Sequence, residues 1–583
     1  MRRLKKIGIF VVAECFKALF RLLMFALVVY AAGKIISMET KEKPVDSGTY
    51  IELRLADEIT ESKIKTPFDI RKEINFYGLL KNLEKAESDP RVEGLILKLD
   101  NVALNRGQIE ELSSKIKEFK ISGKKVYTYA PTFNNGNYVI ASMADKIIMP
   151  ATSGAMSEIT GYFIEIPYYK ALGDKIGVKM NVIHIGDYKS AGEPYERTEM
   201  SKEFRENTER IYNKVYENFL ENISVNRKID KNILNERIMA GDLVLADPET
   251  MKRFGLIDEI EYYENFLAEN NIVNKIGIKE YISRLSMDKK PKEKEKKVYP
   301  KIAVIYAEGT INYFEEGKDL GDVVTPDRIQ KELAIAEKDS DIKGVVIRVN
   351  SPGGSALASD IIYNSIKRMT KPVYISMGGV AASGGYYISA AGEKIYADKE
   401  TLTGSIGVIT MIPNTAELMK KLNVNFETIS KGKYADLGSM NKEMTEDEKD
   451  KLRGSSIKVY EEFVDRVSEG RNMNREDVLK IAEGRVWLGQ EAKEIGLVDE
   501  IGGIEKAVDD LAKKLELGEY RTVESLKEEK IESVIKNYLP KYLMAQVMGE
   551  NTAKVVEKIE KDNMISEELL YKPVLYAPNT DIR

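Results

Sequence analysis

The chain repeats itself, and this internal duplication limits the architectures it can adopt more than any other feature. Three pairs of segments recur in the same order, with one member in each half: residues 89–100 (DPRVEGLILKLD) and 339–350 (DSDIKGVVIRVN), 144–148 (ADKII) and 392–396 (GEKIY), 255–260 (GLIDEI) and 496–501 (GLVDEI). The paired segments are 250, 248 and 241 residues apart. Repetition at a nearly constant spacing indicates a duplicated unit, so we expect two related domains of about 240 residues each.

The order of apolar segments within each copy predicts an α/β fold with parallel sheets. In the second copy, the apolar runs at 345–349 and 373–376 are typical of buried strands. Between them, residues 355–369 carry Leu357, Ile361, Ile362 and Ile366 at helical spacing. A strand, a helix and a strand in this order form a crossover unit, which joins parallel strands and requires covering helices.

The duplication and local composition divide the chain into five parts. We expect a basic stub with a membrane anchor at 1–45, a first domain at 46–288, a charged linker at 289–297, a second domain at 298–520 and a helical tail at 521–583. The linker contains only Lys, Glu and Pro, which is typical of a solvated connection rather than a basic recognition patch. The tail carries an apolar stripe at helical spacing, which fits docking on its own domain or, alternatively, a membrane or subunit contact. The stripe comprises Leu526, Ile531, Val534, Ile535, Tyr538 and Leu539.

The N-terminus predicts a single membrane anchor. Four basic residues among the first six precede an apolar stretch, which continues into a short hydrophobic helix at about residues 19–36. Because basic flanks tend to stay in the cytoplasm, we expect the rest of the chain on the extracytoplasmic side of the cell membrane. A cleaved signal peptide is the alternative, since residues 29–31 (VYA) form a passable processing site.

Charge and residue counts exclude several classes of function. With 89 Lys and Arg against 94 Asp and Glu, the net charge of −5 gives no electrostatic reason to expect a nucleic-acid partner. The only cysteine, Cys15, lies in the predicted anchor segment and excludes both an internal disulfide framework and a cysteine-cluster metal site. The only histidine is His184, so acid–base chemistry is expected to use Lys, Asp, Glu or Tyr. No metal-ligand cluster or nucleotide-binding fingerprint appears, and no cofactor is expected.

Two glycine-rich turns in the second copy place reactive groups at strand ends. Residues 350–355 (NSPGGS) follow a buried strand, so Gly353 and Gly354 offer backbone N–H groups that an anion can approach closely. About 30 residues later, 378–386 (GGVAASGGY) end a second strand and place Ser383 at the start of a helix, followed by Gly384. An N-cap is the alternative role for a serine in this position.

These turns, followed by residues 401–408 (TLTGSIGV), resemble the active-site half of bacterial signal peptide peptidase A. That family consists of membrane-anchored serine proteases of the Clp/crotonase-like fold, and the resemblance extends over nearly the whole chain. It implies a serine and lysine dyad, with the serine on the second copy and the lysine on the first. Ser383 then matches the nucleophile, and Gly354 with Gly384 match the oxyanion donors. The resemblance also implies a homotetramer.

The resemblance identifies Lys189 as the general base and Ser405 as the hydroxyl that orients its amine. Residues 181–191 (NVIHIGDYKSA) end an apolar strand beside small residues, where a lysine can be desolvated enough to lose its proton near neutral pH. The alternative for Lys189 is an ordinary surface lysine. His184 lies only five residues earlier and is the one candidate for a serine and histidine pair, but its apolar surroundings favour a structural role.

Each copy lacks the candidate catalytic residue that the other copy retains. Asn135 in the first copy aligns with Ser383, and Ala435 in the second copy aligns with Lys189, although Lys431 and Lys433 lie nearby. We therefore expect one composite site per chain if the two copies meet, either within a chain or between neighbours.

The sequence thus predicts a membrane-anchored serine endopeptidase with a Ser/Lys dyad. The resemblance implies extended hydrophobic peptides as substrates, such as released signal peptides. Two alternatives from other classes stay open: a crotonase-like acyl-thioester enzyme, which needs no dyad, and a non-catalytic membrane-tethered scaffold.

Overall fold

The computed structural model describes residues 44–55, 59–62, 74–100, 102–288, 298–314, 323–524 and 574–576 of the 583 residues. The predicted anchor at 19–36 and the predicted linker at 289–297 lie outside these ranges. Among the helices of the described ranges, none combines the length and the apolar character needed to span a membrane.

The first half is built on a parallel six-stranded sheet. Its strand order is β10-β1-β2-β3-β5-β9, and every neighbouring pair is parallel. The strands are β1 (Thr49–Arg54), β2 (Val92–Lys98), β3 (Lys125–Tyr129), β5 (Lys146–Met149), β9 (Glu259–Ile260) and β10 (Asn274–Gly277). A small second sheet holds β4 (Thr132–Asn134), β6 (Met156–Glu158) and β8 (Val244–Ala246) in the order β4-β6-β8.

The second half repeats this plan. Its sheet runs β22-β11-β14-β16, after which β16 pairs with β17 and with β18, β17 pairs with β21, and β18 pairs with β20. Only the β18 and β20 pair of this sheet is antiparallel. The strands are β11 (Lys301–Glu308), β14 (Ile342–Ser351), β16 (Val373–Ala382), β17 (Lys394–Ala397), β18 (Leu402–Gly404), β20 (Val486–Leu488), β21 (Glu500–Ile501) and β22 (Arg521–Glu524). The predicted duplication and the predicted parallel α/β sheets are therefore confirmed.

Capped amphipathic helices cover the sheets. Asn105 and Gln108 form a reciprocal capping box at the start of α3, and Thr325 caps α12, where Pro326 occupies the first turn. The first-half helices are α2 (Phe76–Ser88), α3 (Arg106–Ile121), α4 (Asn135–Ala141), α5 (Lys170–Ile176), α6 (Glu193–Glu196), α7 (Lys202–Arg227), α8 (Lys231–Met239), α9 (Pro248–Arg253), α10 (Tyr263–Glu269) and α11 (Ile278–Asp288). The second-half helices are α12 (Pro326–Lys338), α13 (Ala356–Lys367), α14 (Gly384–Ser389), α15 (Ala416–Lys421), α16 (Glu446–Arg471), α17 (Arg475–Ile481), α18 (Gly489–Glu494) and α19 (Ile504–Lys514).

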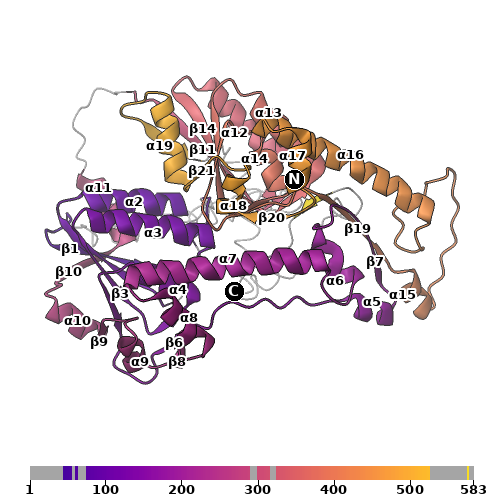
Figure 1. Ribbon diagram of the computed structural model, residues 1–583. Helices are drawn as coiled ribbons and strands as arrows, with labels where there is room; N and C mark the ends of the chain where they lie inside the picture. Colours follow the sequence, from indigo (N-terminus) through magenta and orange to yellow (C-terminus); the bar gives the residue numbers. More distant parts are fainter. Residues whose placement is uncertain are drawn as a thin grey trace, which may run out of the picture.

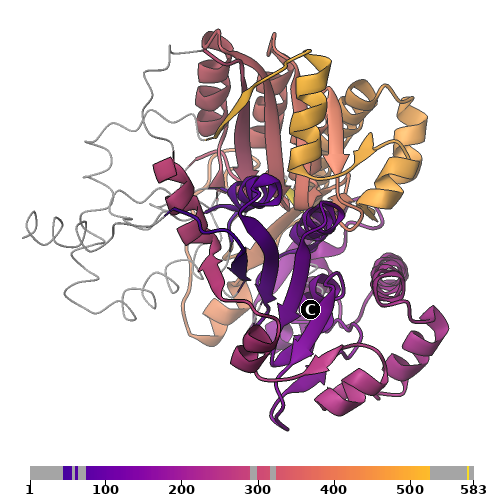
Figure 2. The same ribbon diagram turned by 90° about the vertical axis from the view of Figure 1, so that its left-hand side faces the viewer.

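One of the hydrophobic core clusters spans both halves. Helix α3 of the first half contacts β16 of the second half, and α2 contacts α19 (Figures 1 and 2). One cluster of buried side chains accordingly contains Leu112 and Phe119 from the first half together with Tyr374 and Leu511 from the second. Burial of this apolar surface is the main force that holds the halves together.

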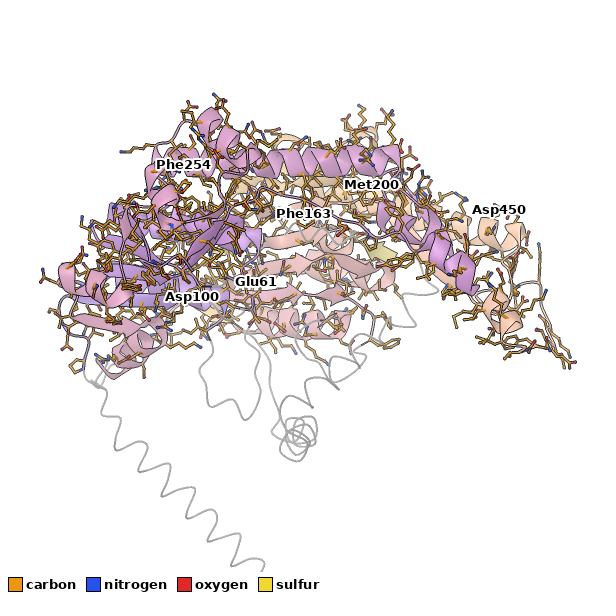
Figure 3. The ribbon with its side chains drawn as sticks, turned by 90° about the horizontal axis from the view of Figure 1, so that it is seen from below. Glu61, Asp100, Phe163, Met200, Phe254 and Asp450 are labelled. Atoms are coloured by element: carbon orange, nitrogen blue, oxygen red, sulfur yellow. The ribbon has the colours of Figure 1, made fainter. Side chains whose placement is uncertain are left out.

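A buried ion-pair network reinforces the same contact. Arg348 on β14 is fully buried and pairs with Glu61 at 3.0 Å and with Glu111 at 2.5 Å, both from the first half. Figure 3, seen from below, labels Glu61 near the boundary between the halves. Because removing one partner of a buried pair leaves an uncompensated charge, this network makes separation of the halves costly.

A third sheet crosses from one half to the other. Its order is β13-β12-β15-β23-β19-β7, and only β7 (Lys179–Ile185) belongs to the first half. Strands β7 and β19 (Val408–Asn414) pair antiparallel from Ile185 opposite Val408 to Lys179 opposite Asn414, and they run side by side in Figure 1. The other strands are β12 (Thr310–Ile311), β13 (Val323–Val324), β15 (Gly353–Ser355) and β23 (Val574–Tyr576).

The described parts of the predicted helical tail are strands. Residues 521–524 form β22, which pairs with β11. Strand β10 pairs with β1 in the same way in the first half, so β22 is the edge strand that completes the repeated sheet. Residues 574–576 form β23, and the rest of the predicted tail, with its apolar stripe, lies outside the described residues.

Candidate active site

Ser383 lies at the junction of β16 and α14 in a backbone conformation that is unusual for a residue with a side chain. Its φ is 55° and its ψ is −117°. Such conformations cost free energy and persist only where the surrounding structure imposes them. The Ser383 N–H donates to the Gly404 carbonyl at 2.8 Å, and the side chain makes no capping hydrogen bond to α14. The alternative role as an N-cap therefore does not apply, and the hydroxyl is available to another partner.

That partner is Lys189. Its Nζ lies 2.7 Å from Ser383 Oγ, 3.0 Å from Ser405 Oγ and 2.9 Å from the Ser405 carbonyl oxygen. All three side chains are buried, with exposed fractions of 2% for Lys189 and 0% for both serines. The structure thus brings together the three residues named from the sequence, from both halves of one chain.

Burial controls the protonation state of this amine. Loss of solvation lowers the pKa of the Lys189 ammonium well below its usual range. A neutral amine has two N–H donors and one lone pair, and three oxygens surround this one. The two N–H groups can donate to the oxygens of Ser405, which leaves the lone pair to accept the proton of Ser383.

Glycine backbones pack together next to Ser383. Gly354 has a φ of 152°, and a Cβ at this position would lie 2.0 Å from the Ile311 carbonyl oxygen. A Cβ on Gly384 would lie 3.1 Å from both the Gly353 Cα and the Gly354 backbone nitrogen. The three glycines of the two turns are therefore in close contact beside the serine, and no side chain fits between them.

One strand of the third sheet passes this glycine turn. The backbone of β23 pairs antiparallel with β15, where Leu575 lies opposite Gly354, and with β19, where Val574 lies opposite Ile409. Strand β23 also contacts α14, the helix that Ser383 precedes. An extended segment therefore fits between β15 and β19, next to the serine.

The other candidate bases named from the sequence do not contact Ser383. His184 on β7 has an exposed side chain whose Nδ1 lies 3.1 Å from the Gly186 carbonyl oxygen. Lys433 is exposed and pairs with Asp447 at 2.9 Å, whereas the hydroxyl of Ser383 is buried.

The aligned residue of the first half has a different environment. Tyr138 and Tyr386 occupy equivalent places, since each donates from its hydroxyl to the carbonyl of a leucine, Leu256 or Leu497. Asn135 therefore corresponds to Ser383, and its Nδ2 donates to the Gly161 carbonyl at 2.5 Å. Asn135 lines a cavity of about 1930 Å³ between the halves, which Ser383, Lys189 and Ser405 do not line.

Sequence reasoning missed the residues that hold Lys189 from the second half. The loop after α17 contributes Glu483, whose carbonyl accepts from the Tyr188 N–H at 2.8 Å, and Gly484, which packs against the Lys189 backbone. The available signal was a glycine-containing turn before β20, which by itself does not indicate a contact across the halves.

Comparison with known proteins identifies both halves. Peptidase family S49 matches residues 118–276 and 365–518, one segment in each half. A protein named Protease 4 from Haemophilus influenzae is 33% identical over 462 residues, covering 75% of this chain and 73% of the relative. The chloroplastic serine protease SPPA of Arabidopsis thaliana is 30% identical over 479 residues, covering 80% of this chain and 69% of the relative. Among solved structures, a ClpP1 mutant from Listeria monocytogenes aligns with 19% identity and a TM-score of 0.24, covering 35% of this chain and 94% of that chain.

Proposed function

The chain belongs to peptidase family S49 and is a serine peptidase, and from this premise we propose that Ser383 and Lys189 form its catalytic dyad. The observation that carries the proposal is the 2.7 Å contact between Lys189 Nζ and Ser383 Oγ in a buried site. Ser405 orients the amine through its hydroxyl and its carbonyl. Lys189 lies in the first S49 segment and both serines in the second, so each segment supplies a necessary part.

The reaction uses the neutral amine of Lys189 as a general base. It takes the proton of Ser383 Oγ as the oxygen attacks the carbonyl carbon of the scissile peptide bond. The resulting ammonium gives this proton to the leaving amine as the C–N bond breaks, which leaves an acyl group on Ser383. Lys189 then takes a proton from water, whose oxygen attacks the acyl carbon, and returns it to Ser383 Oγ as the acid product leaves.

Backbone N–H groups stabilise the oxyanion of each tetrahedral intermediate. We assign this role to Gly354 and Gly384, with Gly353 shaping the turn, since these glycines pack together beside Ser383. Donors that are fixed in a buried site need no reorganisation when charge develops, and removal of one typically costs about 10²–10³-fold in kcat.

The substrate is an extended hydrophobic peptide, such as a released signal peptide. The family resemblance motivates this class, and the space between β15 and β19 supports it because β23 fits there as a strand. A peptide that adds to strand edges gains affinity from main-chain hydrogen bonds and specificity from alternate side chains.

The remaining features of the proposal rest on sequence and resemblance. They are the anchor within residues 1–45, the extracytoplasmic location of the catalytic part, the homotetramer, the Clp/crotonase-like assignment of the fold and the domain division at 289–297. The basic N-terminus before the apolar stretch supports the anchor and its orientation.

A serine-directed phosphonate tests the proposal. The probe should label the intact protein at Ser383, as located by peptide mass mapping, and should not label the Ser383→Ala variant. The acyl-thioester enzyme and the non-catalytic scaffold both predict no Ser383 adduct. Mass mapping of peptide products from the same two proteins then shows whether labelling tracks hydrolysis.

A further inference from the structure

The loop between α17 and β20 of the second half contacts the turn that carries Lys189 and also the turn that carries Ser405. It comprises residues 482–485, of which Glu483, Gly484 and Arg485 make these contacts. On one side it meets residues 186–189 of the first half, and on the other it meets the turn that carries Ser405. The two elements that the loop joins, α17 and β20, are labelled in Figure 1.

Main-chain hydrogen bonds link the loop to each neighbour in turn. The Tyr188 N–H donates to the Glu483 carbonyl at 2.8 Å. The Gly484 N–H donates to the Ile406 carbonyl at 2.7 Å, and the Ser405 N–H donates to the Arg485 carbonyl at 2.8 Å. Three consecutive residues thus connect the backbone beside Lys189 with the backbone of the residue that orients its amine.

The packing in this contact leaves no room for a side chain at either glycine. A Cβ on Gly484 would lie 2.5 Å from the Lys189 nitrogen and 2.7 Å from its Cα. A Cβ on Gly186 would lie 2.6 Å from the Glu483 carbonyl carbon. Backbone therefore packs directly on backbone across the two halves.

Glu483 itself has a strained backbone. Its φ is 56°, a left-handed conformation that glycine adopts at lower cost than glutamate. The side chain explains why a glutamate occupies the position. One carboxylate oxygen accepts from the Tyr460 hydroxyl of α16 at 2.9 Å, and the other accepts from the Asp187 N–H at 3.3 Å.

We propose that Glu483 is a positioning residue for the general base, which holds the 186–189 turn so that the Lys189 amine stays between Ser383 and Ser405. The inference rests on the proposed function, because it assigns a role relative to the proposed base. Without the carboxylate, the turn loses the link from the Asp187 N–H to α16. The amine then gains access to water, which favours its charged form and reduces the fraction that can accept a proton.

Other groups around the turn do not replace this link. The Arg485 guanidinium stacks on the Tyr188 ring at 3.7 Å and approaches Glu206 of α7 at 3.3 Å. These contacts hold the side chain of Tyr188 at the surface, whereas Glu483 holds the backbone. The His184 imidazole also faces the turn, with its Nδ1 3.1 Å from the Gly186 carbonyl oxygen, and Asp187 and Tyr188 belong to the turn itself. The lowered pKa of Lys189 is caused by burial rather than by any of these groups.

The test uses full-length protein and three substitutions. Glu483→Gly removes the carboxylate while relieving the backbone strain, so loss of folding does not confound the result. Glu483→Gln retains an acceptor for the Asp187 N–H and a polar group for Tyr460. Glu516→Gly is the matched control, because Glu516 also has a positive φ, of 53°, but follows α19 away from the site.

We expect Glu483→Gly to lower kcat for peptide hydrolysis by roughly 10- to 100-fold, the scale for a misplaced catalytic group. The neutral amine is the active form, so a raised pKa moves the acidic limb of the kcat profile to higher pH, and the deficit shrinks as pH rises. The Glu483→Gln and Glu516→Gly variants should keep the wild-type profile. Tyr460→Phe should shift the profile in the same direction by a smaller amount.

Two results distinguish the inference from its premise. If thermal unfolding shows that the Glu483→Gly variant is folded, and the variant keeps the wild-type kcat and pH profile, the positioning role is wrong while the dyad stands. If instead Lys189→Ala retains wild-type hydrolysis, the proposed function itself fails. A uniform loss in Glu483→Gly without a pH shift would also overturn the inference, because it would indicate a merely structural role.

Discussion

The amine of Lys189 lies 2.7 Å from the hydroxyl of Ser383, although 194 residues separate them in the chain. They meet because β7 of the first half pairs with β19 of the second, which carries the lysine to the carboxyl end of β16. The proposed site therefore exists only where the two copies of the duplication are in contact.

The first prediction concerns the dyad. Ser383→Ala and Lys189→Ala should each lower kcat by roughly 10⁴-fold or more, and the double variant should be no worse than either, because groups that act as one unit are not additive. Hydrolysis of a fluorogenic hydrophobic peptide measures the effect. His184→Asn should retain most activity, since that side chain is exposed on β7. A His184 variant as inactive as the Ser383 variant would contradict the dyad.

The second prediction is that Lys189→Met stabilises the fold at neutral pH while abolishing activity. Burial lowers the pKa of Lys189 below its ordinary value of 10.5 in the folded state. Between the two pKa values the unfolded chain binds a proton that the native chain does not, so the unfolding free energy of the wild type rises with pH in this window. The Met variant lacks this slope and should gain roughly 1–3 kcal/mol. Urea unfolding at several pH values measures the unfolding free energy and its dependence on pH. A Met variant that is less stable than the wild type at every pH would refute the expectation.

The third prediction concerns the buried ion pairs between the halves. Arg348→Met should lower the unfolding free energy by about 3–5 kcal/mol, because it leaves Glu61 and Glu111 buried without their cation. Burial already raises the pKa of Glu111, so protonation in acid should reduce this deficit. Arg475→Met is the control, since its partner Asp465 is exposed and such pairs contribute about 1 kcal/mol or less. Equal losses in the two variants would show that the network does not hold the halves together.

The fourth prediction follows from the position of β23. Removal of residues 574–583 should lower the KM for a peptide substrate several-fold with little change in kcat, because it vacates the strand position between β15 and β19. Steady-state kinetics of the truncated and intact proteins provide the measurement. An unchanged KM would mean that substrates bind elsewhere.

The sequence predicted the parts of the site that local patterns encode. Ser383 and the glycines follow buried strands, and the repeated segments predicted two parallel sheets, because strand periodicity and turn composition are local properties. Alignment of the two copies also predicted that Asn135 takes the place of Ser383 in the first half, as the equivalent tyrosines Tyr138 and Tyr386 show.

The contacts between the halves could not be predicted from local sequence patterns. Nothing local indicates that β7 pairs with a strand more than 200 residues away, that α3 packs on β16, or that Glu483 holds the turn before Lys189. The strand β22 was likewise missed, since its role as a sheet edge depends on β11 rather than on its own four residues.

The last prediction asks whether the composite site forms within one chain. The structure places Lys189 and Ser383 together in a single chain, so co-expression of Ser383→Ala with Lys189→Ala should restore no peptide hydrolysis, even where the two variants assemble with each other. Differently tagged variants, purified through both tags in succession, provide mixed assemblies for the assay. The positive control is a chain cut within residues 289–297, which should stay active because the halves share a buried core and the Arg348 ion pairs. Recovery of a substantial fraction of wild-type hydrolysis in the mixed assembly would show that β7 and its lysine come from a neighbouring chain.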